Sequence, residues 1–531
     1  MNSTPRPAGG RSCRRRLLLV AFCALLPPPA VGQTRAAGGD GARYVVALDR
    51  AATRWRVTAT FDHGGGPFEA WFQRWTPGAY HLADYGASVE QIVAHDGAGG
   101  ELPLERDGPC RVVVADAPAG PIALEYVAAP CAQRDVNERM ILSVEGNRIA
   151  SDYAYVSPNS LLCFVRDQVD LPCEVRYELP PGWKAACALD ERAPGTFAAP
   201  SWWRLEDSPA LFSATQETAT FEVDGVPHAV TLHGAAPGRA DEIAQRCRRL
   251  AEAAAAWMQR LPYPRYHYLL ACLPGELGGA GLEHADSSLI VTGDVMLGTP
   301  EYDHLLAHEY FHAWCAERIK VDALVRPDFT APLRTGTIWA NEGITEYFCR
   351  HLLVSAGLQT RAQFFAGLSQ QGREARMMRP LIGEEGWTAI ARAAPDWDEM
   401  GDLMRFSARH YPAGSFTVFA LDLEMRAASG GERGIADLLR FLMAAFADRG
   451  RGYGEDELVR LVAGVAQADL DDFFARHIEG GELPTVKERL ALIGFTTRGG
   501  MQEMVPLPEP TAEQAAALED LFTPPPTQPR R

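Results

Sequence analysis

The sequence is poor in positive charge, and it lacks several patterns that would assign it to a particular class of protein. Lys and Arg number 51 against 68 Asp and Glu, which gives a formal net charge of -17. This deficit of positive charge disfavours nucleic acid or an anionic membrane surface as a partner. No internal repeat is present, which argues against a repeat architecture. No Cys-x-x-Cys pair is present either, so a zinc site built from cysteines is not expected.

Apart from one stretch near the N-terminus, the sequence has no apolar run that suggests a membrane span. That stretch carries arginines at positions 11 and 14–16, a short apolar segment from Leu17 to Leu26, and small residues up to Gly32. The apolar segment is too short to cross a bilayer comfortably, and the order of the parts is typical of a secretory signal peptide. We therefore predict a signal peptide over residues 1–32 and an exported protein, periplasmic or secreted, without stable insertion in the membrane.

The cysteines are few enough to be counted individually. Of the eleven cysteines, Cys13 and Cys23 lie in the predicted signal peptide, and the nine that remain are an odd number. At least one thiol is therefore unpaired unless it bonds to another chain. Export would permit one or two disulfides in the first half of the chain, although the sequence does not give their connectivity. The cysteines available there are Cys110, Cys131, Cys163, Cys173 and Cys187.

The first part of the mature chain has the pattern of β-structure. The length of 531 residues suggests two to four domains. Between residues 33 and 225, apolar and polar residues alternate in several segments, for example Arg54–Phe61, and clusters of Gly and Pro separate these segments. A period of two residues is that of half-buried strands, and the Gly and Pro clusters are typical of turns. We predict a β-sandwich-like N-terminal domain over residues 33–225.

The pattern changes near Pro237. Ala-rich segments with apolar residues at helical spacing begin at Arg239 and recur as far as residue 477. We predict a mainly helical second domain over residues 226–495. The Pro-rich tail, residues 496–531, is expected to be disordered or loosely docked. The expected fold class is therefore α+β multidomain, with the strands and most of the helices in separate domains.

One segment of the helical region contains a His-Glu-x-x-His motif, formed by His308, Glu309 and His312. In a helix, two histidines four residues apart lie on the same face, one turn apart. Their imidazoles can bind one Zn²⁺, and the glutamate beside the metal can take a proton from a bound water. A motif with three fixed positions also occurs by chance, so an ordinary helix that carries two histidines is the alternative.

A catalytic zinc ion needs a third protein ligand and one open coordination position. The segment Trp339–Tyr347 supplies two carboxylates on a further predicted helix, Glu342 and Glu346. Glu342 is the expected third ligand, which gives a site of two histidines and one glutamate for one zinc ion per chain. Glu346 lies one turn later and is expected to accept the second ring N–H of a ligand histidine. The alternative for Glu346 is a solvated carboxylate on the helix surface.

The two motifs together resemble the gluzincin clan of metallopeptidases. Twenty-nine residues separate His312 from Glu342, and this gap is similar to that of metallopeptidase family 61, the glycyl aminopeptidase family. Five further segments resemble motifs of this family in the same order, so that the resemblance extends from about Tyr44 to Phe495. These segments are Trp75–Tyr80, Asp207–Pro209, Leu261–Tyr268, Gly281–His284 and Phe473–Pro484.

The resemblance implies a thermolysin-like catalytic domain and roles for three more residues. Glu283, in the Gly-Leu-Glu-His segment, is implied to hold the free α-ammonium of the substrate. His284 beside it is either a substrate-binding residue or a structural one. Tyr411, in a Tyr-x-x-Gly segment, is implied to stabilise the oxyanion of the transition state. Tyr310 and Tyr347 are alternatives for this last role, but both belong to the predicted metal helices.

The chain also departs from the family in two ways. Fewer than fifty residues follow Pro484, so the family's usual C-terminal PDZ domain is expected to be absent. Cys315 stands three residues after His312, where the family usually has a polar residue. At a rise of about 1.5 Å per residue, Cys315 lies about 4.5 Å further along the helix than His312. We therefore expect a structural thiol and not a fourth metal ligand.

The leading hypothesis is an exported zinc aminopeptidase that hydrolyses the first peptide bond of peptides with a free N-terminus. Glu309 would take the proton of the attacking water and pass one to the leaving amine. The resemblance implies a preference for small N-terminal residues such as Gly or Ala. One alternative is a zinc endopeptidase with the same metal site. Another is a non-catalytic peptide-binding protein of the cell envelope. The sequence leaves the oligomeric state open.

Overall fold

The computed structural model describes residues 41–526, except for 132, 137–138, 143, 274–277, 384, 397–399 and 500–502. The predicted signal peptide lies outside the described residues, so its prediction stays untested. Among the helices of the described chain, none combines the length and the apolar character that a membrane span requires.

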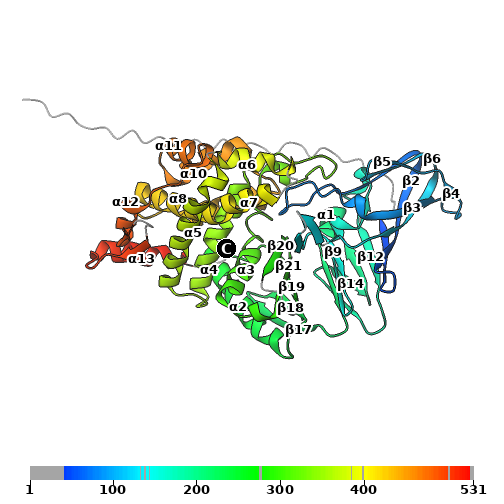
Figure 1. The fold of residues 1–531 in the computed structure, drawn as a ribbon, viewed down its shortest axis with the longest axis horizontal. Helices are drawn as coiled ribbons and strands as arrows, with labels where there is room; N and C mark the ends of the chain where they lie inside the picture. Colours follow the sequence, from blue (N-terminus) through cyan, green and yellow to red (C-terminus); the bar gives the residue numbers. More distant parts are fainter. Residues whose placement is uncertain are drawn as a thin grey trace, which may run out of the picture. The chain divides into compact units, whose positions relative to one another are not determined.

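Ten strands of the described N-terminal region form one large sheet (Figure 1). Its order is β14-β15-β12-β1-β2-β6-β3-β4, with β11 paired to β2 and β5 paired to β6. In the long strand β2, Trp55, Val57, Ala59 and Phe61 are buried while the residues between them are more exposed, which is the alternation expected of a sheet with one face in a core. The strands are β1 (Arg43–Asp49), β2 (Arg54–Phe72), β3 (Val89–His95), β4 (Glu101–Leu102), β5 (Glu105–Asp107), β6 (Arg111–Ala128), β11 (Cys163–Phe164), β12 (Cys173–Glu178), β14 (Asp190–Ala193) and β15 (Thr196–Ala199).

A second sheet of four strands packs against the first. Phe212 of this sheet contacts Trp55 at 6.1 Å and Tyr177 at 4.8 Å between ring centroids, and both of these partners belong to the large sheet. The domain is therefore built from two packed sheets, as the alternating pattern predicted. The second sheet consists of β9 (Asn147–Ile149), β10 (Tyr153–Val156), β13 (Lys184–Cys187) and β16 (Ala210–Ser213), and a separate hairpin consists of β7 (Gln133–Val136) and β8 (Arg139–Leu142).

The second domain, which we call the catalytic region after the role that the resemblance implies, begins with a five-stranded mixed sheet in the order β17-β18-β19-β21-β20. The strands are β17 (Glu217–Val223), β18 (Val226–His233), β19 (Tyr266–Leu273), β20 (Gly279–His284) and β21 (Ser287–Gly293). The predicted domain boundary at residue 225 falls inside the β17–β18 hairpin, and the pairing of these strands places β17 in the second domain. Strand β20 pairs only with β21 among the described strands, so it forms the edge of the sheet.

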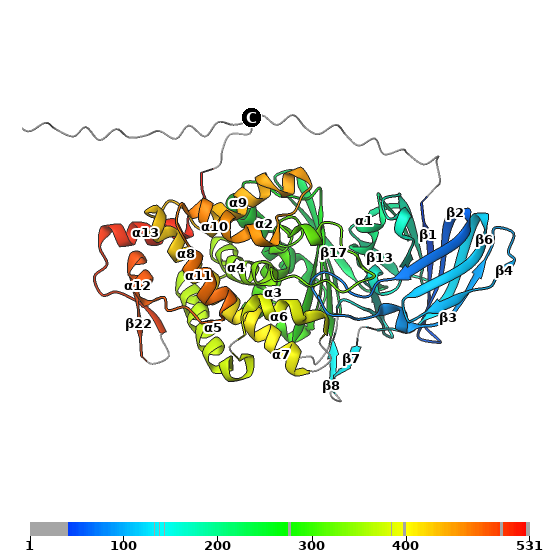
Figure 2. The same cartoon turned by 90° about the horizontal axis from the view of Figure 1, so that it is seen from above.

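Helices make up most of the rest of the second domain, as predicted. Helix α2 packs against β17 and β18, and α3 packs against β20 and β21. Helix α8 contacts α4, α5, α9, α10 and α12, and Figure 2 shows it among them. The helices are α1 (Trp202–Glu206), α2 (Arg239–Met258), α3 (Pro300–Phe311), α4 (Ile344–Ser355), α5 (Arg361–Ile382), α6 (Trp387–Ala393), α7 (Met400–Ala408), α8 (Gly414–Ser429), α9 (Ile435–Ala445), α10 (Leu458–Ala466), α11 (Asp471–Phe473), α12 (Lys487–Leu490) and α13 (Ala512–Phe522), with π-helical turns η6 (Trp339–Gly343), η8 (Arg409–Ala413) and η11 (Phe474–Glu479).

Of the two expectations for the tail, disorder is wrong for most of its described residues, and the tail is docked. Strands β22 (Phe495–Arg498) and β23 (Glu503–Pro506) form a hairpin, and α13 follows it. Thr511 caps α13, since its side chain accepts a hydrogen bond from the Gln514 amide. Phe522 at the end of α13 is buried and lies 4.9 Å from the ring of Phe364. Apolar contacts therefore hold the tail on the catalytic region in spite of its proline content.

The cysteines of the described chain are all free thiols. Eight of the nine are buried, among them Cys163 in β11 and Cys247 in α2. Burial raises the pKa of the Cys163 thiol to about 12, because the thiolate would lose its hydration. The disulfides that export would permit are therefore not formed in this structure.

Candidate metal centre

The His-Glu-x-x-His motif lies at the end of helix α3, where both histidines are buried. Thr299 begins the helix, because its hydroxyl accepts a hydrogen bond from the Tyr302 amide, and Pro300 occupies the first helical position. The helical spacing brings the Nε2 atoms of His308 and His312 to 3.0 Å from each other. The two histidines of the motif therefore face one point, as their spacing predicted.

Glu342 completes this group from the π-helical turn η6. Its Oε2 atom lies 3.5 Å from Nε2 of His308 and 3.6 Å from Nε2 of His312. A tetrahedral ion with ligand distances of about 2.0 Å places neighbouring ligand atoms about 3.3 Å apart. The three donor atoms thus have the mutual spacing of three corners of a zinc site. The widened turn is typical of functional positions, since a π-turn re-aims one side chain of a helix.

The hydrogen bonds around the triad leave its three donor atoms free for a cation. Nδ1 of His312 lies 2.7 Å from the carbonyl oxygen of Cys315, and Nδ1 of His308 lies 3.0 Å from Oε2 of Glu346. Nδ1 of each ring thus lies against an oxygen atom, through a hydrogen bond in His312 and an ion-pair contact in His308, and the two Nε2 atoms face the shared position. Oε2 of Glu342 is buried and has no hydrogen-bond partner among the described residues. This donor set fits Zn²⁺.

Glu346 is held by donors from three sides, so the alternative of a solvated carboxylate is wrong. Its Oε1 accepts hydrogen bonds from His304 at 2.8 Å, Gln371 at 2.6 Å and Arg350 at 3.3 Å, and only 6% of the residue is exposed. Burial opposes ionisation, but the charges and hydrogen bonds of His304 and His308 hold the pKa of Glu346 well below its usual range. The carboxylate therefore remains ionised against Nδ1 of His308.

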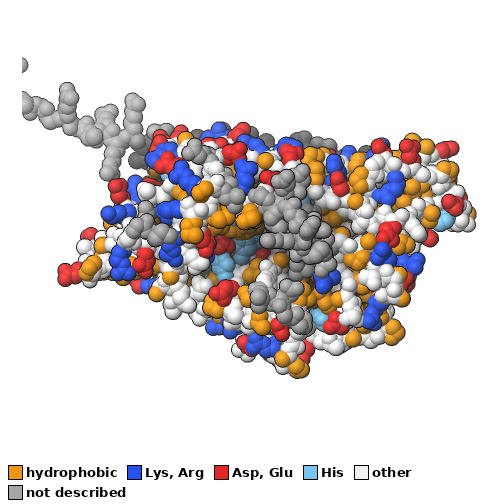
Figure 3. Space-filling model, viewed as in Figure 1, with side chains coloured by type: hydrophobic (Ala, Val, Ile, Leu, Met, Phe, Trp, Pro, Cys, Tyr) orange, Lys and Arg blue, Asp and Glu red, His pale blue; other side chains and the backbone are white. Residues whose placement is uncertain are grey.

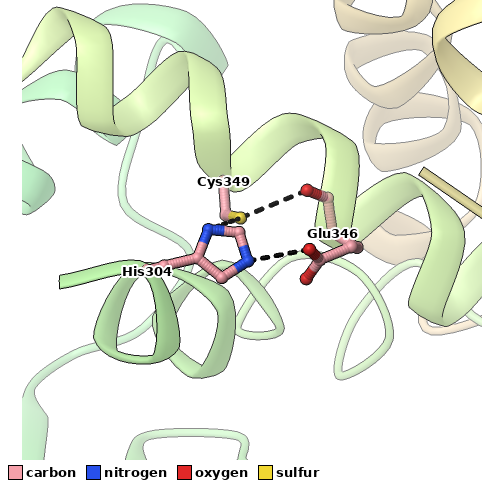
Figure 4. A group of neighbouring side chains, drawn as sticks. All are labelled: His304, Glu346 and Cys349. Atoms are coloured by element: carbon pink, nitrogen blue, oxygen red, sulfur yellow. Dashed lines mark hydrogen bonds and ion pairs between the residues drawn. The ribbon is translucent and has the colours of Figure 1, made fainter. Parts of the chain in front are cut away.

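His304 is a neighbour of the site that the sequence reasoning missed, although it lies one helical turn before His308. Figure 4 shows its ring between Glu346 and Cys349. The ligand atoms of these three residues lie within 4.8 Å of one another, as in a cation site. Both oxygens of Glu346 are already engaged by protein donors, however, and Arg350 lies beside them. We therefore assign this cluster to the positioning of His308.

Glu309 lies beside the triad on the side of the edge strand β20. A Cβ atom at Gly281 would lie 2.4 Å from the Glu309 carboxylate, so the glycine leaves the space that this side chain occupies. Burial, together with the negative charges of Glu283 and Glu342, raises the pKa of Glu309. In the absence of a cation, Glu309 therefore binds a proton readily, which is the property that a general base requires.

Glu283 projects from β20 to the same point. Its carboxylate, that of Glu309 and a ring nitrogen of His312 lie within 4.8 Å of one another. A cavity begins at Glu283 and continues past His284 and Asp207. Figure 3 shows histidine and carboxylate side chains inside a hollow on one face of the molecule. A bound cation and a positively charged substrate group can therefore lie side by side here.

His284 is fixed by Asp207, a residue to which the sequence reasoning gave no role at the site. Nδ1 of His284 lies 2.9 Å from Oδ1 of Asp207, and the Ala285 amide donates to the other oxygen at 2.9 Å. Burial opposes ionisation, but the hydrogen bond and charge of His284 lower the pKa of Asp207. Nε2 of His284 has no hydrogen-bond partner among the described residues. The structure thus leaves one nitrogen of His284 available.

Tyr411 reaches the metal triad from the π-helical turn η8, and its ring centroid lies 5.7 Å from that of His308. A close backbone contact joins η8 to η6, because a Cβ atom at Gly414 would lie 3.1 Å from Cα of Gly343. A methyl group at either position would require the two backbones to separate by a few tenths of an ångström. The contact therefore brings Tyr411 and Glu342 to the same site.

The alternatives to Tyr411, and Cys315, lie elsewhere. The hydroxyl of Tyr310 is hydrogen-bonded to Tyr263, and that of Tyr347 donates to Asp422 at 2.8 Å, so both tyrosines face the core. The Cys315 thiol contacts the carbonyl oxygen of Ala340 at 3.5 Å and is not part of the triad.

The N-terminal domain also places a phenol next to η6, in the segment Trp75–Tyr80, to which the sequence reasoning gave no role at the site. The Tyr80 hydroxyl accepts a hydrogen bond from the side-chain amide of Asn341 at 3.1 Å, and Asn341 immediately precedes Glu342. Tyr80 is 2% exposed. Because its partner lies 261 positions away in the sequence, no local pattern could have shown this contact.

Family models match the chain in both domains. The model described as the Peptidase M61 N-terminal domain matches residues 43–214, and the model described as M61 glycyl aminopeptidase matches residues 301–385. The second match contains the motif of α3 and Glu342. None of the curated proteins matches this chain in sequence.

Solved structures share the fold. An aminopeptidase N family protein from Idiomarina loihiensis superposes with a TM-score of 0.77 at 21% sequence identity, covering 86% of this chain and 79% of that chain. An M1 zinc metallopeptidase from Deinococcus radiodurans, a glutamate-to-alanine mutant bound to a Tyr-Ser-Ala substrate, gives a TM-score of 0.54 at 16% identity, covering 84% and 95%. At these identities the likeness concerns the fold alone.

Proposed function

The chain belongs to the M61 peptidase family, whose two domain models match it in order, and from this premise we propose that it is an exported zinc aminopeptidase. The family and the buried triad make it a metallopeptidase. Export rests on the N-terminal arginines and the apolar segment that follows them, and the preference for N-terminal Gly or Ala rests on the family resemblance. The single observation that carries the aminopeptidase assignment is the position of Glu283 beside Glu309 and His312.

One zinc ion per chain would be held by His308, His312 and Glu342. When bound, it would polarise the substrate carbonyl and lower the pKa of the attacking water. Glu309 takes the proton of that water and later passes a proton to the leaving amine. Its buried position beside other carboxylates favours the protonated form, so the proton is kept until the amine leaves.

Tyr411 stabilises the negative charge that develops on the carbonyl oxygen. Burial, together with the charges of Glu342 and Glu309, raises the pKa of Tyr411 well above its usual range, so the phenol keeps its proton and can donate it in a hydrogen bond. Glu346 keeps the ring of His308 in one orientation through the contact at Nδ1. These residues act on the bond that the substrate places at the metal triad.

Glu283 selects that bond. A carboxylate this close to the catalytic base pairs with the free α-ammonium of a peptide, which places the first peptide bond at the metal triad. His284 would contribute a hydrogen bond to the same end of the substrate through its free nitrogen. The partners of the protein are therefore peptides with a free N-terminus.

The test compares alanyl p-nitroanilide with its N-acetylated form, in the wild type and in Glu283→Gln. We expect hydrolysis of the free amine only, inhibition by chelators, and a loss of kcat/KM of about 10²-fold in Glu283→Gln because a charge-assisted contact is lost. Glu301→Gln, an exposed carboxylate on the same helix as the motif, is the matched control and should retain activity.

Two results would point to the alternatives. Equal cleavage of the acetylated substrate would remove the role of Glu283 and support an endopeptidase. Peptide binding that is unaffected by Glu309→Gln, in a wild type that turns over no peptide, would support a non-catalytic binding protein.

A further inference from the structure

The turn that carries Tyr80 is fixed to the catalytic region, although it belongs to the N-terminal domain. The indole N–H of Trp75 donates to the carbonyl oxygen of Ala331 at 2.8 Å, and its ring lies 5.4 Å from that of Phe329. The amide of Arg74 donates to the Phe329 carbonyl oxygen at 2.9 Å. This segment of the catalytic region therefore holds the turn in place beside the metal centre.

Two residues of the turn adopt conformations that favour a fixed geometry. Tyr80 has φ of 59°, a left-handed conformation that is uncommon for a bulky residue and typical of functional sites. Gly78 has φ of 82°, and a Cβ atom there would lie 2.8 Å and 3.0 Å from the two carboxylate oxygens of Glu283. The turn therefore runs against Glu283 and ends with the Tyr80 ring buried near Glu342.

The hydroxyl of Tyr80 is an acceptor for Asn341, which leaves its own proton for another partner. No hydrogen bond from this hydroxyl to a described residue is present. Burial, followed by the negative charges of Glu342 and Glu283, raises the pKa of Tyr80 well above its usual range, so the phenol stays protonated. A free donor thus lies between a metal ligand and the carboxylate that anchors the substrate amine.

We propose that Tyr80 is a further catalytic residue, whose hydroxyl donates a hydrogen bond to the carbonyl oxygen of the substrate's first residue as that oxygen gains charge. This inference rests on the proposed function. The first residue of a bound peptide must bridge Glu283 and the metal triad, and the contacts of Gly78 with Glu283 and of Tyr80 with Asn341 place the phenol next to this path. The Asn341 amide orients the phenol, and Tyr411 donates from the helical side. The N-terminal domain thereby supplies part of the active site.

The experiment removes only the hydroxyl, in Tyr80→Phe. Its matched control is Tyr126→Phe, which removes a buried hydroxyl in the same domain that donates to the Leu161 carbonyl oxygen at 3.0 Å. Kinetics with alanyl p-nitroanilide give kcat and KM. Calorimetry gives the Kd of the phosphonate analogue of alanine, which mimics the tetrahedral state, and the Kd of alanine itself. Metal analysis gives the zinc content.

For Tyr80→Phe we expect kcat to fall about 100-fold, because the loss of one donor to a developing oxyanion costs about 10²–10³ in kcat. KM, the Kd of alanine and the zinc content should stay within threefold, while the Kd of the phosphonate should rise by a factor similar to the loss of kcat. Tyr126→Phe should match the wild type in all five quantities.

Unchanged kcat and phosphonate affinity in Tyr80→Phe would overturn the proposal. A loss of kcat accompanied by loss of zinc, or by equal weakening of alanine and phosphonate, would overturn it as well, since it would show a purely structural role. A wild type without any peptidase activity would sink the proposed function instead. In that case, the phosphonate and alanine affinities of the wild type and of Tyr80→Phe still decide whether Tyr80 contacts the tetrahedral group. A contact would weaken the binding of the phosphonate more than that of alanine in the variant.

Discussion

The two domains bury different kinds of side chain. Among the described residues of the N-terminal domain, the buried carboxylates, histidines and arginines are limited to Glu145 and Glu206. Glu206 itself lies at the cavity beside Glu283. In the catalytic region many more are buried: His228, His233, Glu283, His284, Asp286, Asp303, His308, Glu309, His312, Glu342, Glu346, Arg350, His351, Arg409, His410, Asp422 and His477.

This difference indicates that the N-terminal domain relies on apolar packing for stability, whereas the catalytic region holds the groups that can take part in chemistry. Buried ionisable groups cost free energy unless hydrogen bonds and opposite charges offset their lost hydration. The N-terminal domain avoids that cost and packs aromatic and aliphatic residues such as Trp55, Phe212 and Tyr177. The catalytic region contains many such groups, and several of them form the proposed metal centre and the carboxylate pair Glu283 and Glu309. Mutations in the catalytic region should therefore mainly impair catalysis, and mutations in the N-terminal domain should mainly lower stability. Tyr80 is the exception, because it belongs to the N-terminal domain and is proposed to act in catalysis.

Exchange of a buried carboxylate in each domain tests this contrast most strongly. Glu309→Gln should lower kcat by about 10²–10⁴-fold, because the general base is lost. Its zinc content should be unchanged, since Glu309 is not one of the three ligands. Glu145→Gln in the N-terminal domain should retain kcat within twofold. Steady-state kinetics and metal analysis check both, and a Glu309→Gln enzyme with wild-type turnover would refute the mechanism.

Removal of the carboxylate behind His308 should have the next largest effect. Glu346→Ala should weaken zinc binding by about 10–100-fold, because the ring of His308 loses the acceptor that fixes it. Glu206→Gln is the control, as a buried carboxylate without contact to a zinc ligand. Competition with a chelator measures the affinity. Equal zinc affinity in Glu346→Ala and the wild type would show that His308 is oriented by other contacts.

Acid should lower the folding stability of the catalytic region, because its buried histidines are held in the neutral form. Burial lowers the pKa of His228 to about 4, and its ring is hydrogen-bonded to the Val226 carbonyl and the Tyr263 hydroxyl. The unfolded chain binds a proton near pH 6.5, so the stability that neutral His228 contributes is complete above pH 6.5 and is lost as pH falls towards 4. At pH 5 the loss should be about 2 kcal/mol.

Urea unfolding of the wild type and His228→Gln at pH 7 and pH 5 isolates this effect. The wild type should lose more stability than the variant on acidification. The same exchange at His63, which lies in strand β2 opposite Gly120 of β6, is the control in the N-terminal domain. If the wild type and His228→Gln lost equal stability between the two pH values, His228 would not be the acid-sensitive group.

The smallest effect is expected from a comparison of two glycines with equal φ. Gly78 and Gly182 both have φ of 82°, but a Cβ atom at Gly182 meets no atom within 4 Å, whereas one at Gly78 would press on Glu283. Exchange to alanine should cost each about 1–2 kcal/mol in strain. Only Gly78→Ala should also lower kcat/KM, by about tenfold for a displaced substrate anchor. Equal kcat/KM in the two variants would separate the turn from the substrate site.

The sequence predicted those parts of the site that local geometry determines. His308 and His312 share a helix, so their spacing alone places them on one face. Glu342 followed from the kind of ligand that zinc requires and from the family resemblance. The wide turn of η6 that aims Glu342 at the histidines has no signature in the sequence.

Contacts between distant segments could not be predicted. The turn that ends at Tyr80 is visible as a turn, but its neighbours Asn341 and Glu283 are supplied by the fold. Proline content suggested a disordered tail, but it says nothing about the fit of Phe522 against Phe364. The strand β17 was assigned to the wrong domain for the same reason, because a strand's partner is set by tertiary packing.

The contact between Gly343 and Gly414 limits how this active site can change. A Cβ atom at Gly414 would lie 3.1 Å from Cα of Gly343, and one at Gly343 would lie 3.3 Å from Cα of Gly414, so a methyl group at either position would require the two backbones to separate by a few tenths of an ångström. Any such change would shift the ligand Glu342 and the phenol of Tyr411 together. The turns η6 and η8 are therefore coupled through this contact. A substitution there affects the proposed metal ligand and the proposed hydrogen-bond donor at the same time.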